Sequence, residues 1–452
     1  MFKERYKRIV LPSLFIFDLF VVYISYLVCE LSFGYDITFK AEKLFILLFW
    51  VIPSFFLKTY RVPRVSTYIK AIKPCIFNCL SFSIFYIFYI FLGFNSFYLI
   101  SFHLVFLSTI SASQLIFCFI RYTFFHEYRL QGKNIRQALL FGNLTSNEIK
   151  HLNNDSLIYG YHFIETISNS ENYLKKIKII TTEQKIDFVF LYESNKSLTD
   201  SIKAFCDDNG IRMKILLPLS SSTGINAGLE NIGGFPVIDV RYEPLLYLEN
   251  RFLKRLIDII ISVVSIILVL SWLPIVVKVI QALTYPGPLF FIQDRVGRDG
   301  KIFKLYKFRS MKVTSNQSLA KEGKSQLTIE SDSRISSFGR LLRRTNLDEY
   351  PQFINVLVGK MSTVGPRPHM VGEDQSLENL VPKYRVRRFV KPGLTGWAAI
   401  NGLRGGTKDV ELMVKRTNYD IWYLENWNIF LDIKIIFITV WQMITFKIPK
   451  AY

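Results

Sequence analysis

Four apolar runs fill the first 121 residues of this 452-residue chain, and they constrain its fold more than any other feature. The runs cover roughly residues 9–32, 43–58, 74–95 and 97–120. A helix needs about 20 apolar residues to cross a bilayer, and all but the second run come near that length. We therefore expect residues 1–121 to form a unit of four transmembrane helices.

Basic residues gather at particular ends of these runs. They precede the first run, fill the connection after the second and follow the fourth: Lys3, Arg5, Lys7 and Arg8; Lys58, Arg61, Arg64, Lys70 and Lys73; Arg121, Arg129, Lys133 and Arg136. The other two connections are short and poor in positive charge. Because cytoplasmic flanks carry the excess of Lys and Arg, both ends of the unit should lie in the cytoplasm. The first run is long and lacks a small-residue cleavage site, so it predicts a helix rather than a signal peptide.

Composition also favours a membrane protein, and one with an acidic partner. Half of the residues are hydrophobic, 15% are aromatic and the formal net charge is +20. Anionic lipid and a phosphorylated substrate account for this charge, and we expect no nucleic-acid partner because no base-stacking module is visible. Asp18 lies inside the first run. Such an acid is either functional or held by a structural hydrogen bond, and its place near a helix end favours the second.

The five cysteines show no metal-ligand spacing. After Cys206 the chain holds no cysteine and a single histidine, His369. A cysteine nucleophile and a histidine metal cluster are therefore excluded from the second half of the chain.

Residues 135–240 differ in character from the apolar part. Short β-rich runs such as QALLFGN and DFVFLYES alternate with polar, helix-like stretches, which is typical of a small α/β domain with a parallel sheet. The first strand ends at Gly142 without the G-x-G-x-x-G that a dinucleotide-binding fold places there. We expect a Rossmann-like domain with a docking or regulatory role, and nucleotide binding is the less favoured alternative.

A long apolar run from Leu256 to Val277 opens the last part of the chain. Lys254 and Arg255 precede this run and Lys278 follows it closely, so both ends look cytoplasmic. A single span would instead place the basic C-terminal part outside the cell.

Pro274 lies inside the same run and would break a helix there. We expect a re-entrant helix over about residues 254–280, which enters one leaflet, bends and returns; an ordinary fifth span is the alternative. Near the C-terminus, the uncharged run after Lys434 is too short to span a bilayer, and its Trp and Phe content predicts a helix that lies in the interface.

Blocks rich in Gly, Pro and Arg follow: YPGPLFFIQDRVGRDGKIFKLYKFRSM, RISSFGRLLRRTNLDEYPQFINVLVGKMSTVGPRPH and FVKPGLTGWAAINGLRGG. Their order resembles the bacterial sugar transferases, monotopic polyprenyl-phosphate hexose-1-phosphate transferases that start surface polysaccharide assembly. The resemblance covers residues 251–452, and the parts ahead of it resemble the large form of the family. It implies a mainly α-helical monotopic catalytic domain, on the cytoplasmic face of a multi-pass protein in the bacterial inner membrane.

The resemblance implies a reaction, in which a sugar-1-phosphate moves from a UDP-sugar to undecaprenyl phosphate and UMP leaves. This is the first step of exopolysaccharide, capsule or O-antigen assembly. The acidic pair of the family's LDE block is Asp348 and Glu349 here. The resemblance makes Asp348 the nucleophile that forms an aspartyl-phosphosugar, and Glu349 the residue that handles a proton or places the lipid phosphate. It also implies Mg²⁺, with Asp348 as its contact.

Physical chemistry supports these roles, although adjacent acids more often begin a helix. A carboxylate can attack phosphorus and divide one hard step into two easier ones. Asn346 or Asp348 could instead cap a helix, and capping and catalysis can coexist.

Two acids in a phosphate-binding site need more cations than acids around them. Arg343 and Arg344 precede the pair by about one and a half helical turns, and Arg367 lies in the Pro-flanked block GPRP. Lys307 and Arg309 come from YKFRSM. We expect all five to bind substrate phosphate. A structural ion pair is the alternative for Arg367, and lipid-headgroup contact is the alternative for Lys307 and Arg309.

The C-terminal blocks bear on the sugar, because GLTGWAAINGLRGG and KRTNYDIWYLENWNIFLDIKIIF look most like the undecaprenyl-phosphate glucose phosphotransferases of the family. Ala399 stands where those proteins commonly have Gln, and YPGP replaces SPGP. Glucose is therefore favoured, with galactose or an N-acetylhexosamine as alternatives. Gly393 and Gly396 are expected to serve a turn, and holding phosphate through their amides is the alternative.

Two other functional classes compete with the enzyme. A non-catalytic membrane sensor or assembly factor would use the helices and the α/β domain, but the intact LDE, GPRP and KFRSM blocks oppose it. A transporter of lipid-linked sugar would need more spans and an acidic relay. The expected partners are a UDP-sugar, undecaprenyl phosphate, membrane lipids and a second copy of the chain in a homodimer.

Overall fold

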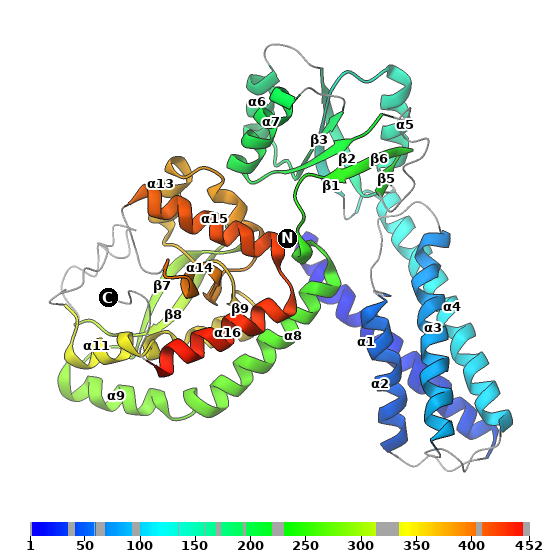
Figure 1. Cartoon of the computed structure of the whole chain (residues 1–452), viewed down its shortest axis with the longest axis horizontal. Coiled ribbons are helices and arrows are strands. Elements are labelled where there is room, and N and C mark those ends of the chain that lie inside the picture. The colour runs from blue at the N-terminus through cyan, green and yellow to red at the C-terminus, as the bar shows by residue number, and fades with distance from the viewer. Residues whose placement is uncertain are drawn as a thin grey trace. The chain divides into compact units, whose positions relative to one another are not determined.

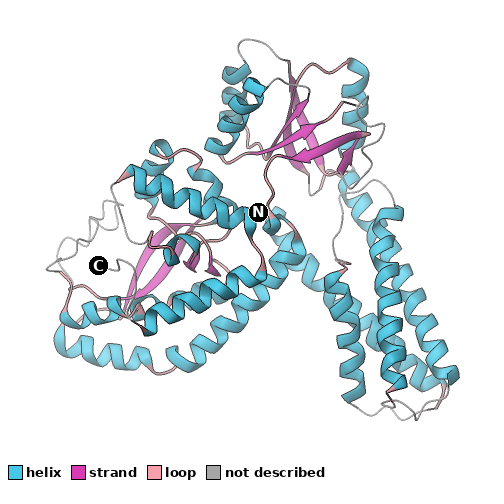
Figure 2. Cartoon of the chain, viewed as in Figure 1, coloured by secondary structure: helices cyan, strands magenta, loops and turns pink. Residues whose placement is uncertain are grey.

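The computed structural model describes residues 2–34, 41–57, 59, 68–92, 100–133, 135–157, 159–168, 173–192, 196–218, 230–312, 334–403 and 409–445. The chain forms two compact units (Figures 1 and 2). The first unit is Met1–Asn195 with Met213–Val240, and the second is Lys196–Arg212 with Arg241–Tyr452.

The first unit begins with four helices: α1 (Phe2–Ser32), α2 (Ala41–Phe56), α3 (Tyr68–Phe91) and α4 (Ile100–Leu130). Three of them contain segments long and apolar enough to cross a membrane: Phe15–Ser32, Ala71–Phe91 and Ile100–Leu130. The apolar part of α2, Lys43–Ser54, is shorter, as its sequence indicated. Four spans therefore stay a prediction. The cations Lys58, Arg61 and Arg64, which bear on orientation, lie outside the described residues.

Polar groups inside these helices hold one another. Asp18 is 2% exposed and accepts a hydrogen bond from the indole N–H of Trp50 at 2.7 Å. Glu30 and Lys43 form a buried ion pair at 2.7 Å. A buried charge or carboxylate is costly without such a partner. The contact with Trp50 agrees with the structural interpretation of Asp18.

The rest of the first unit is an α/β domain. Its elements are β1 (Arg136–Phe141), α5 (Ser146–Ser156), β2 (Tyr161–Ile167), α6 (Tyr173–Glu183), β3 (Phe188–Tyr192), β4 (Arg212–Leu216), β5 (Glu230–Ile232) and β6 (Phe235–Asp239). The sheet order is β2-β1-β3-β4-β6-β5. β1 pairs in parallel with β2 and β3, whereas β6 pairs antiparallel with β4 and β5. The sheet is therefore mixed, and a Rossmann-like assignment stays a prediction.

The turn after β1 is built for packing. A Cβ on Gly142 would lie 2.3 Å from the carbonyl oxygen of Tyr192, so only glycine lets β1 and β3 approach here. The N-terminus of α5 is occupied by the chain itself, because Glu148 accepts hydrogen bonds from the backbone N–H and hydroxyl of Thr145, both at 2.8 Å. A phosphate at this helix start would meet that carboxylate, which weighs against nucleotide binding here.

The second unit is mostly helical, with short strands. Its elements are α7 (Lys196–Asn209), η2 (Pro244–Leu246), α8 (Leu248–Ser265), η3 (Ile266–Leu270), α9 (Leu273–Thr284), β7 (Phe290–Val296), η4 (Arg298–Gly300), β8 (Ile302–Phe308), α11 (Ser337–Arg344), η5 (Leu347–Glu349), α12 (Gln352–Leu357), β9 (Ser362–Val364), α13 (Val371–Leu380), η6 (Tyr384–Phe389), β10 (Gly393–Thr395), α14 (Trp397–Ile400), α15 (Val410–Asn426) and α16 (Ile429–Ile444). β7 and β8 form an antiparallel hairpin, and β9 pairs in parallel with β10. Side chains of α9 and α11 pack against the ends of β7 and β8.

Helix α7 belongs to the second unit, although residues 196–212 lie in sequence within the predicted α/β domain. Asp207 at its C-terminal end pairs with Arg241 at 2.8 Å, and Asp208 accepts from the backbone N–H of Lys383 at 2.9 Å. The ring of Phe389 lies 4.1 Å from the guanidinium of Arg212. α7 therefore packs against η6.

Helices α8 and α9 form a pair bent by 47°. Pro274 lies in the first turn of α9, where the missing N–H costs nothing, so the predicted break occurs just before it. Lys254 is 7% exposed and pairs with Asp432 at 2.6 Å, and Arg255 donates to backbone carbonyls of α12. These two cations thus anchor α8 to the rest of the unit. Whether the pair crosses the membrane or returns stays a prediction.

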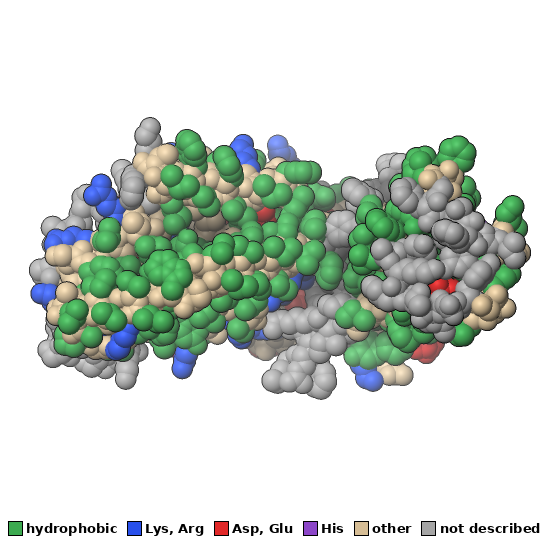
Figure 3. Space-filling model, turned by 90° about the horizontal axis from the view of Figure 1, so that it is seen from below, with side chains coloured by type: hydrophobic (Ala, Val, Ile, Leu, Met, Phe, Trp, Pro, Cys, Tyr) green, Lys and Arg blue, Asp and Glu red, His purple; other side chains and the backbone are tan. Residues whose placement is uncertain are grey.

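Apolar side chains cover one face of the second unit, which Figure 3 shows. They come from α8, η3, α9 and α16: Leu256, Ile260, Val264, Ile267, Leu268, Trp272, Ile275, Val279, Leu283, Phe430, Ile433, Phe437, Trp441 and Ile444. We call this set the apolar face. An exposed apolar surface of this extent is typical of membrane contact.

Candidate active site

Asp348 and Glu349 lie in the short 3₁₀ turn η5, between α11 and α12. Asn346 begins this turn in the left-handed region, with φ 54°, and makes no side-chain cap. The N-cap of α12 is Pro351, also without a side-chain hydrogen bond. The capping interpretation of Asn346 and Asp348 is therefore wrong, because the turn ends before α12 begins.

Two cations hold Glu349 in place. The ammonium of Lys307, on β8, lies 2.7 Å from Oε1 of Glu349. The guanidinium of Arg367 donates to both carboxylate oxygens, at 2.7 and 3.3 Å. Glu349 is 6% exposed, so these charge-assisted bonds form away from bulk water. The structure brings together three of the predicted site residues.

Asp348 differs from its neighbour. It is 7% exposed, yet no hydrogen bond or ion pair within the described residues engages its carboxylate. The pKa of Asp348 is raised to about 6, first because the carboxyl is buried; the charge of Glu349 also raises this pKa, whereas the charges of Lys307, Arg343 and Arg367 lower it. This carboxyl is thus poised to change protonation state near neutral pH.

The paired arginines of α11 separate. The Nε–H of Arg343 donates to the hydroxyl of Ser310 at 2.8 Å, and the Arg343 charge lowers the pKa of Asp348. Arg344 is exposed and makes no polar side-chain contact within the described part of the chain. The structure therefore brings Arg343, and not Arg344, to the acidic pair.

Arg309 does not face the acidic pair, contrary to our expectation. Its guanidinium donates to three backbone carbonyls, those of Tyr285 at 2.7 Å, Pro288 at 2.8 Å and Met311 at 3.2 Å. It also lies 4.9 Å from the ring centre of Tyr285. Arg309 is 2% exposed and serves the YPGP loop, whose carbonyls need donors that the prolines cannot supply.

The loop that carries Arg367 is held by close backbone packing. A Cβ on Gly393 would lie 2.0 Å from the backbone nitrogen of Gly365, and one on Gly396 would lie 2.3 Å from the carbonyl oxygen of Gly365. The Gly393 N–H donates to the carbonyl of Pro366 at 2.9 Å. The expectation that Gly393 and Gly396 merely serve a turn is therefore wrong, because they let β10 and the GPRP loop touch.

Sequence reasoning missed three more arginines near Arg367. Arg295 on β7 donates to the carbonyl of Pro368 at 3.2 Å. Arg387 on η6 donates to the carbonyl of Arg367 at 2.9 Å. Arg416 on α15 is 5% exposed and, like Arg295, has its pKa lowered to about 10, first by burial and then by neighbouring arginines. Only long-range packing marks these residues, and no local pattern could have found them.

The residues also bear on the expected Mg²⁺. No group of three or more His, Cys, Asp or Glu within the described ranges could hold a metal ion by itself. Glu349 is already engaged by two cations, whereas Asp348 is not. Mg²⁺ is commonly bound through one or two carboxylates, water and substrate phosphates. Asp348 as single protein contact fits that mode.

Ala399, where the resemblance led us to note a missing Gln, lies in α14. Next to it, the rings of Trp397 and Trp422 stack with centres 4.7 Å apart, and the ammonium of Lys434 lies 5.9 Å from the Trp397 ring centre. The carbonyl of Ile400 accepts from the amide of Gln442 at 3.2 Å. This corner joins α14 to α15 and α16.

Known proteins resemble the last part of this chain. The family described as "Bacterial sugar transferase" matches residues 249–446. "UDP-glucose:undecaprenyl-phosphate glucose-1-phosphate transferase" of Escherichia coli (strain K12) is 43% identical over 218 residues, which are 48% of this chain and 46% of that protein. "Undecaprenyl-phosphate galactose phosphotransferase" of Salmonella typhimurium is 36% identical over 202 residues, covering 42% of this chain and 40% of that protein. The chain thus matches less than half the length of these two relatives.

A shorter relative is covered almost completely. "Exopolysaccharide production protein PSS" of Rhizobium leguminosarum bv. phaseoli is 42% identical over 196 residues, which are 43% of this chain and 96% of that protein. Together with the site geometry, this match shows that the chain belongs to the bacterial sugar transferase family.

Proposed function

We propose that this protein is a phosphoglycosyl transferase that moves hexose-1-phosphate from a UDP-sugar to undecaprenyl phosphate and releases UMP. The observation that carries the proposal is the difference between the two acids. Glu349 is held by Lys307 and Arg367, while Asp348 has no hydrogen bond or ion pair within the described residues. A nucleophile must be free to attack, and a residue that positions cations must be paired.

Asp348 acts in two steps. One of its carboxylate oxygens attacks the sugar-side phosphorus of the UDP-sugar, and the bond from that phosphorus to the bridging oxygen breaks. UMP leaves with the bond's electron pair, and the sugar phosphate stays on Asp348 as an acyl-phosphate. An oxygen of undecaprenyl phosphate then attacks the same phosphorus, which frees the Asp348 carboxylate and forms the lipid diphosphate sugar.

The cations around the pair offset the charge of the reactants. Lys307, Arg343 and Arg367 approach Asp348 from β8, α11 and the GPRP loop. Phosphoryl transfer asks a protein chiefly for such positioning and neutralisation. Mg²⁺ held by Asp348 and the donor diphosphate would supply further neutralisation of phosphate charge when bound.

In the proposed mechanism, Glu349 orients two cationic side chains and does not transfer a proton. A carboxylate that accepts hydrogen bonds from Lys307 and both terminal nitrogens of Arg367 is a poor proton acceptor. It orients these two donors toward the phosphates of donor and lipid. We therefore favour the phosphate-placing role of Glu349 over proton transfer.

Glucose is the sugar that we favour. The Escherichia coli relative is named for glucose, whereas the Salmonella typhimurium relative is named for galactose. Ala399 differs from the usual Gln, so galactose and an N-acetylhexosamine stay in the panel of candidates. Release of UMP from UDP-glucose, UDP-galactose, UDP-N-acetylglucosamine and UDP-N-acetylgalactosamine, each with undecaprenyl phosphate, would rank them.

The proposal places the second unit at the cytoplasmic face of the bacterial inner membrane, with α8 and α9 as a re-entrant pair. The apolar face and the 47° bend support this placement. The proposal also includes a multi-pass chain whose ends lie in the cytoplasm, and its assembly as a homodimer. In this place the protein would start exopolysaccharide, capsule or O-antigen assembly.

One experiment separates the enzyme from a non-catalytic assembly factor. Purified protein with Mg²⁺ and UDP-glucose should release at most about one UMP per protein by itself and should release UMP over many turnovers once undecaprenyl phosphate is added in excess, and chelation of Mg²⁺ should stop release. No UMP from any of the four donors would contradict the enzyme and leave the assembly factor as the better account.

A further inference from the structure

Arg387 links the active-site loop to the interior of the second unit. It lies on η6 and is 5% exposed. One terminal nitrogen donates to the backbone carbonyl of Arg367 at 2.9 Å and lies 2.9 Å from the carboxylate of Asp420, on α15. The other lies 2.9 Å from Nδ1 of His369 and 3.2 Å from the hydroxyl of Tyr384.

These partners make Arg387 rigid. Asp420 is 2% exposed and His369 is 4% exposed. The His369 ring has a pKa well below its ordinary value, first because it is buried and then because of arginines that include Arg387. It is therefore neutral, and its Nε2, which lies 3.1 Å from the same guanidinium nitrogen, can accept a hydrogen bond from Arg387. A guanidinium whose two terminal nitrogens are both engaged in this way has few other orientations.

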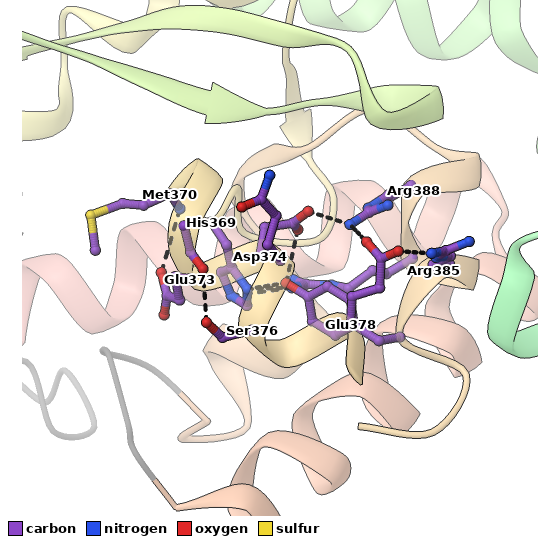
Figure 4. A network of polar contacts seen from close by, with 12 residues as sticks. His369, Met370, Glu373, Asp374, Ser376, Glu378, Arg385 and Arg388 are labelled. Carbon is purple, nitrogen blue, oxygen red and sulfur yellow. Dashed lines mark hydrogen bonds and ion pairs between the residues drawn. The ribbon is translucent and has the colours of Figure 1, made fainter. Parts of the chain in front are cut away.

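The helix that carries Arg387, η6, is also joined to α13 by ion pairs. Figure 4 shows this network, in which Glu378 of α13 contacts Arg385 and Arg388 and Asp374 contacts Arg388. The hydroxyl of Tyr384 donates to Asp374 at 2.9 Å, and the same hydroxyl lies 2.5 Å from His369. These contacts hold η6 in place against α13.

The hydrogen bond from Arg387 to the carbonyl of Arg367 is not needed to neutralise the charge of Arg387, because the carboxylate of Asp420 alone would do so. The additional bond goes to the carbonyl of the residue whose side chain holds Glu349. A shift of that carbonyl by about 1 Å would carry the Arg367 guanidinium away from Glu349 and Asp348, and misplacement of this size can cost about 100-fold in rate.

We propose that Arg387 is a positioning residue for phosphoryl transfer, which fixes the backbone of Arg367 so that its guanidinium stays between the acidic pair and the substrate phosphates. This inference rests on the proposed function. Arg387 acts through Arg367 and does not touch the reacting atoms.

The test compares Arg387→Met with Arg385→Met, a matched change two residues earlier on the same helix. Arg385 pairs with Glu378, and no contact within the described residues joins its side chain to Arg367. When Arg385 is replaced, Arg388 and Tyr384 still join η6 to Asp374 of α13. UMP release is measured at saturating undecaprenyl phosphate, with kcat and KM for the donor. We expect Arg387→Met to lower kcat/KM about 10- to 100-fold, whereas Arg385→Met should leave kcat/KM unchanged. Arg387→Lys, which keeps the positive charge and one donor nitrogen, should recover part of the loss and serves where the Met variant does not fold.

A double-mutant cycle isolates the route through Arg367. In an Arg367→Gln background, Arg387→Met should change kcat/KM less than about twofold, because the group that it positions is already gone. Fully additive losses would overturn the inference while leaving the proposed function intact. A wild-type chain that releases no UMP from any donor would instead overturn the proposed function, and the inference with it.

Discussion

At the scale of residues, two adjacent carboxylates have different surroundings. Asp348 and Glu349 are about equally buried and share a turn, but only Glu349 meets Lys307 and Arg367 directly. The sequence blocks named both acids and Lys307, Arg343 and Arg367, which the fold brings together, and the roles of these residues stay predictions. The pairing of Glu349 with Lys307 and Arg367 could not be derived from sequence, because it depends on which atoms the fold brings within hydrogen-bond distance.

The pH dependence of activity should respond to the charges around Asp348. With a pKa of about 6, Asp348 becomes an effective nucleophile as pH rises through 6. Glu349→Gln removes a negative charge and frees two cations, so the acid limb should move to lower pH. Lys307→Met removes a positive charge, so the limb should move to higher pH. UMP release measured between pH 5 and 9 checks both signs, and shifts in the same direction would contradict this electrostatic account.

The Asp348 carboxyl should also lower the stability of the protein at neutral pH. Its folded-state pKa is raised from 3.8 to about 6, so folding favours the neutral form. The neutral carboxyl stabilises the folded state, relative to the charged form, below pH 3.8, and this contribution is lost as pH rises through 6. Its full size in the free energy of unfolding corresponds to roughly 3 kcal/mol. Asp348→Asn should therefore raise the thermal midpoint at pH 8 and change it little at pH 4, while activity is lost.

The matched control for that measurement is Asp294→Asn. Asp294 is exposed on β7, so its replacement should leave the thermal midpoint unchanged at both pH values. A midpoint that falls at pH 8 in Asp348→Asn would mean that the Asp348 carboxylate stabilises the fold, which would contradict the expected cost of burying its charge.

The prediction for Arg309 was wrong because it rested on charge alone, and three buried arginines near Arg367 were not predicted at all. Arg309 directly follows the strand β8. From sequence alone, an arginine at such a position that binds phosphate cannot be distinguished from one that binds backbone carbonyls. Arg295, Arg387 and Arg416 come from β7, η6 and α15, which are distant in sequence. They meet only through tertiary packing, which single-sequence patterns do not encode.

At the scale of elements, apolar runs predicted helices well and their ends less well. α1 and α4 extend beyond the apolar runs that predicted them, because flanking charged residues continue the helix. Pro274 was placed correctly as a break, since proline fits the first turn of a helix and not its interior. The packing of α7 with the second unit was not predictable, because its sequence reads as one more helix of the α/β domain.

Helix α11 should depend on a single glycine. A Cβ on Gly339 would lie 1.9 Å from the carbonyl oxygen of Ser310, so Gly339→Ala must push α11 away from β8. We expect a loss of about 2–4 kcal/mol in the free energy of unfolding, with reduced activity because Arg343 moves with the helix. Ser337→Ala, on the exposed side of α11, should change neither. Thermal unfolding and UMP release measured on both variants check this, and a stable, active Gly339→Ala would contradict the observed packing.

At the scale of the whole molecule, topology decides whether the site can meet a cytoplasmic nucleotide sugar. If the bent pair α8–α9 returns to the side from which it enters, the C-terminus lies in the cytoplasm. A green fluorescent protein fused at the C-terminus should then fluoresce, and alkaline phosphatase at the same place should be inactive. Phosphatase fused after Gly34, between α1 and α2, should be active as the control. The reverse pattern at the C-terminus would make α8–α9 an ordinary span.

The central claim is a covalent intermediate on Asp348, and trapping it is the most direct test. Wild-type protein given UDP-glucose labelled with ³²P in the sugar-side phosphate, without undecaprenyl phosphate, should retain label after denaturation. Added undecaprenyl phosphate should discharge the label before the quench, and Asp348→Asn should carry none. Turnover of UDP-glucose by the wild-type protein with no labelled protein under any quench would contradict the account.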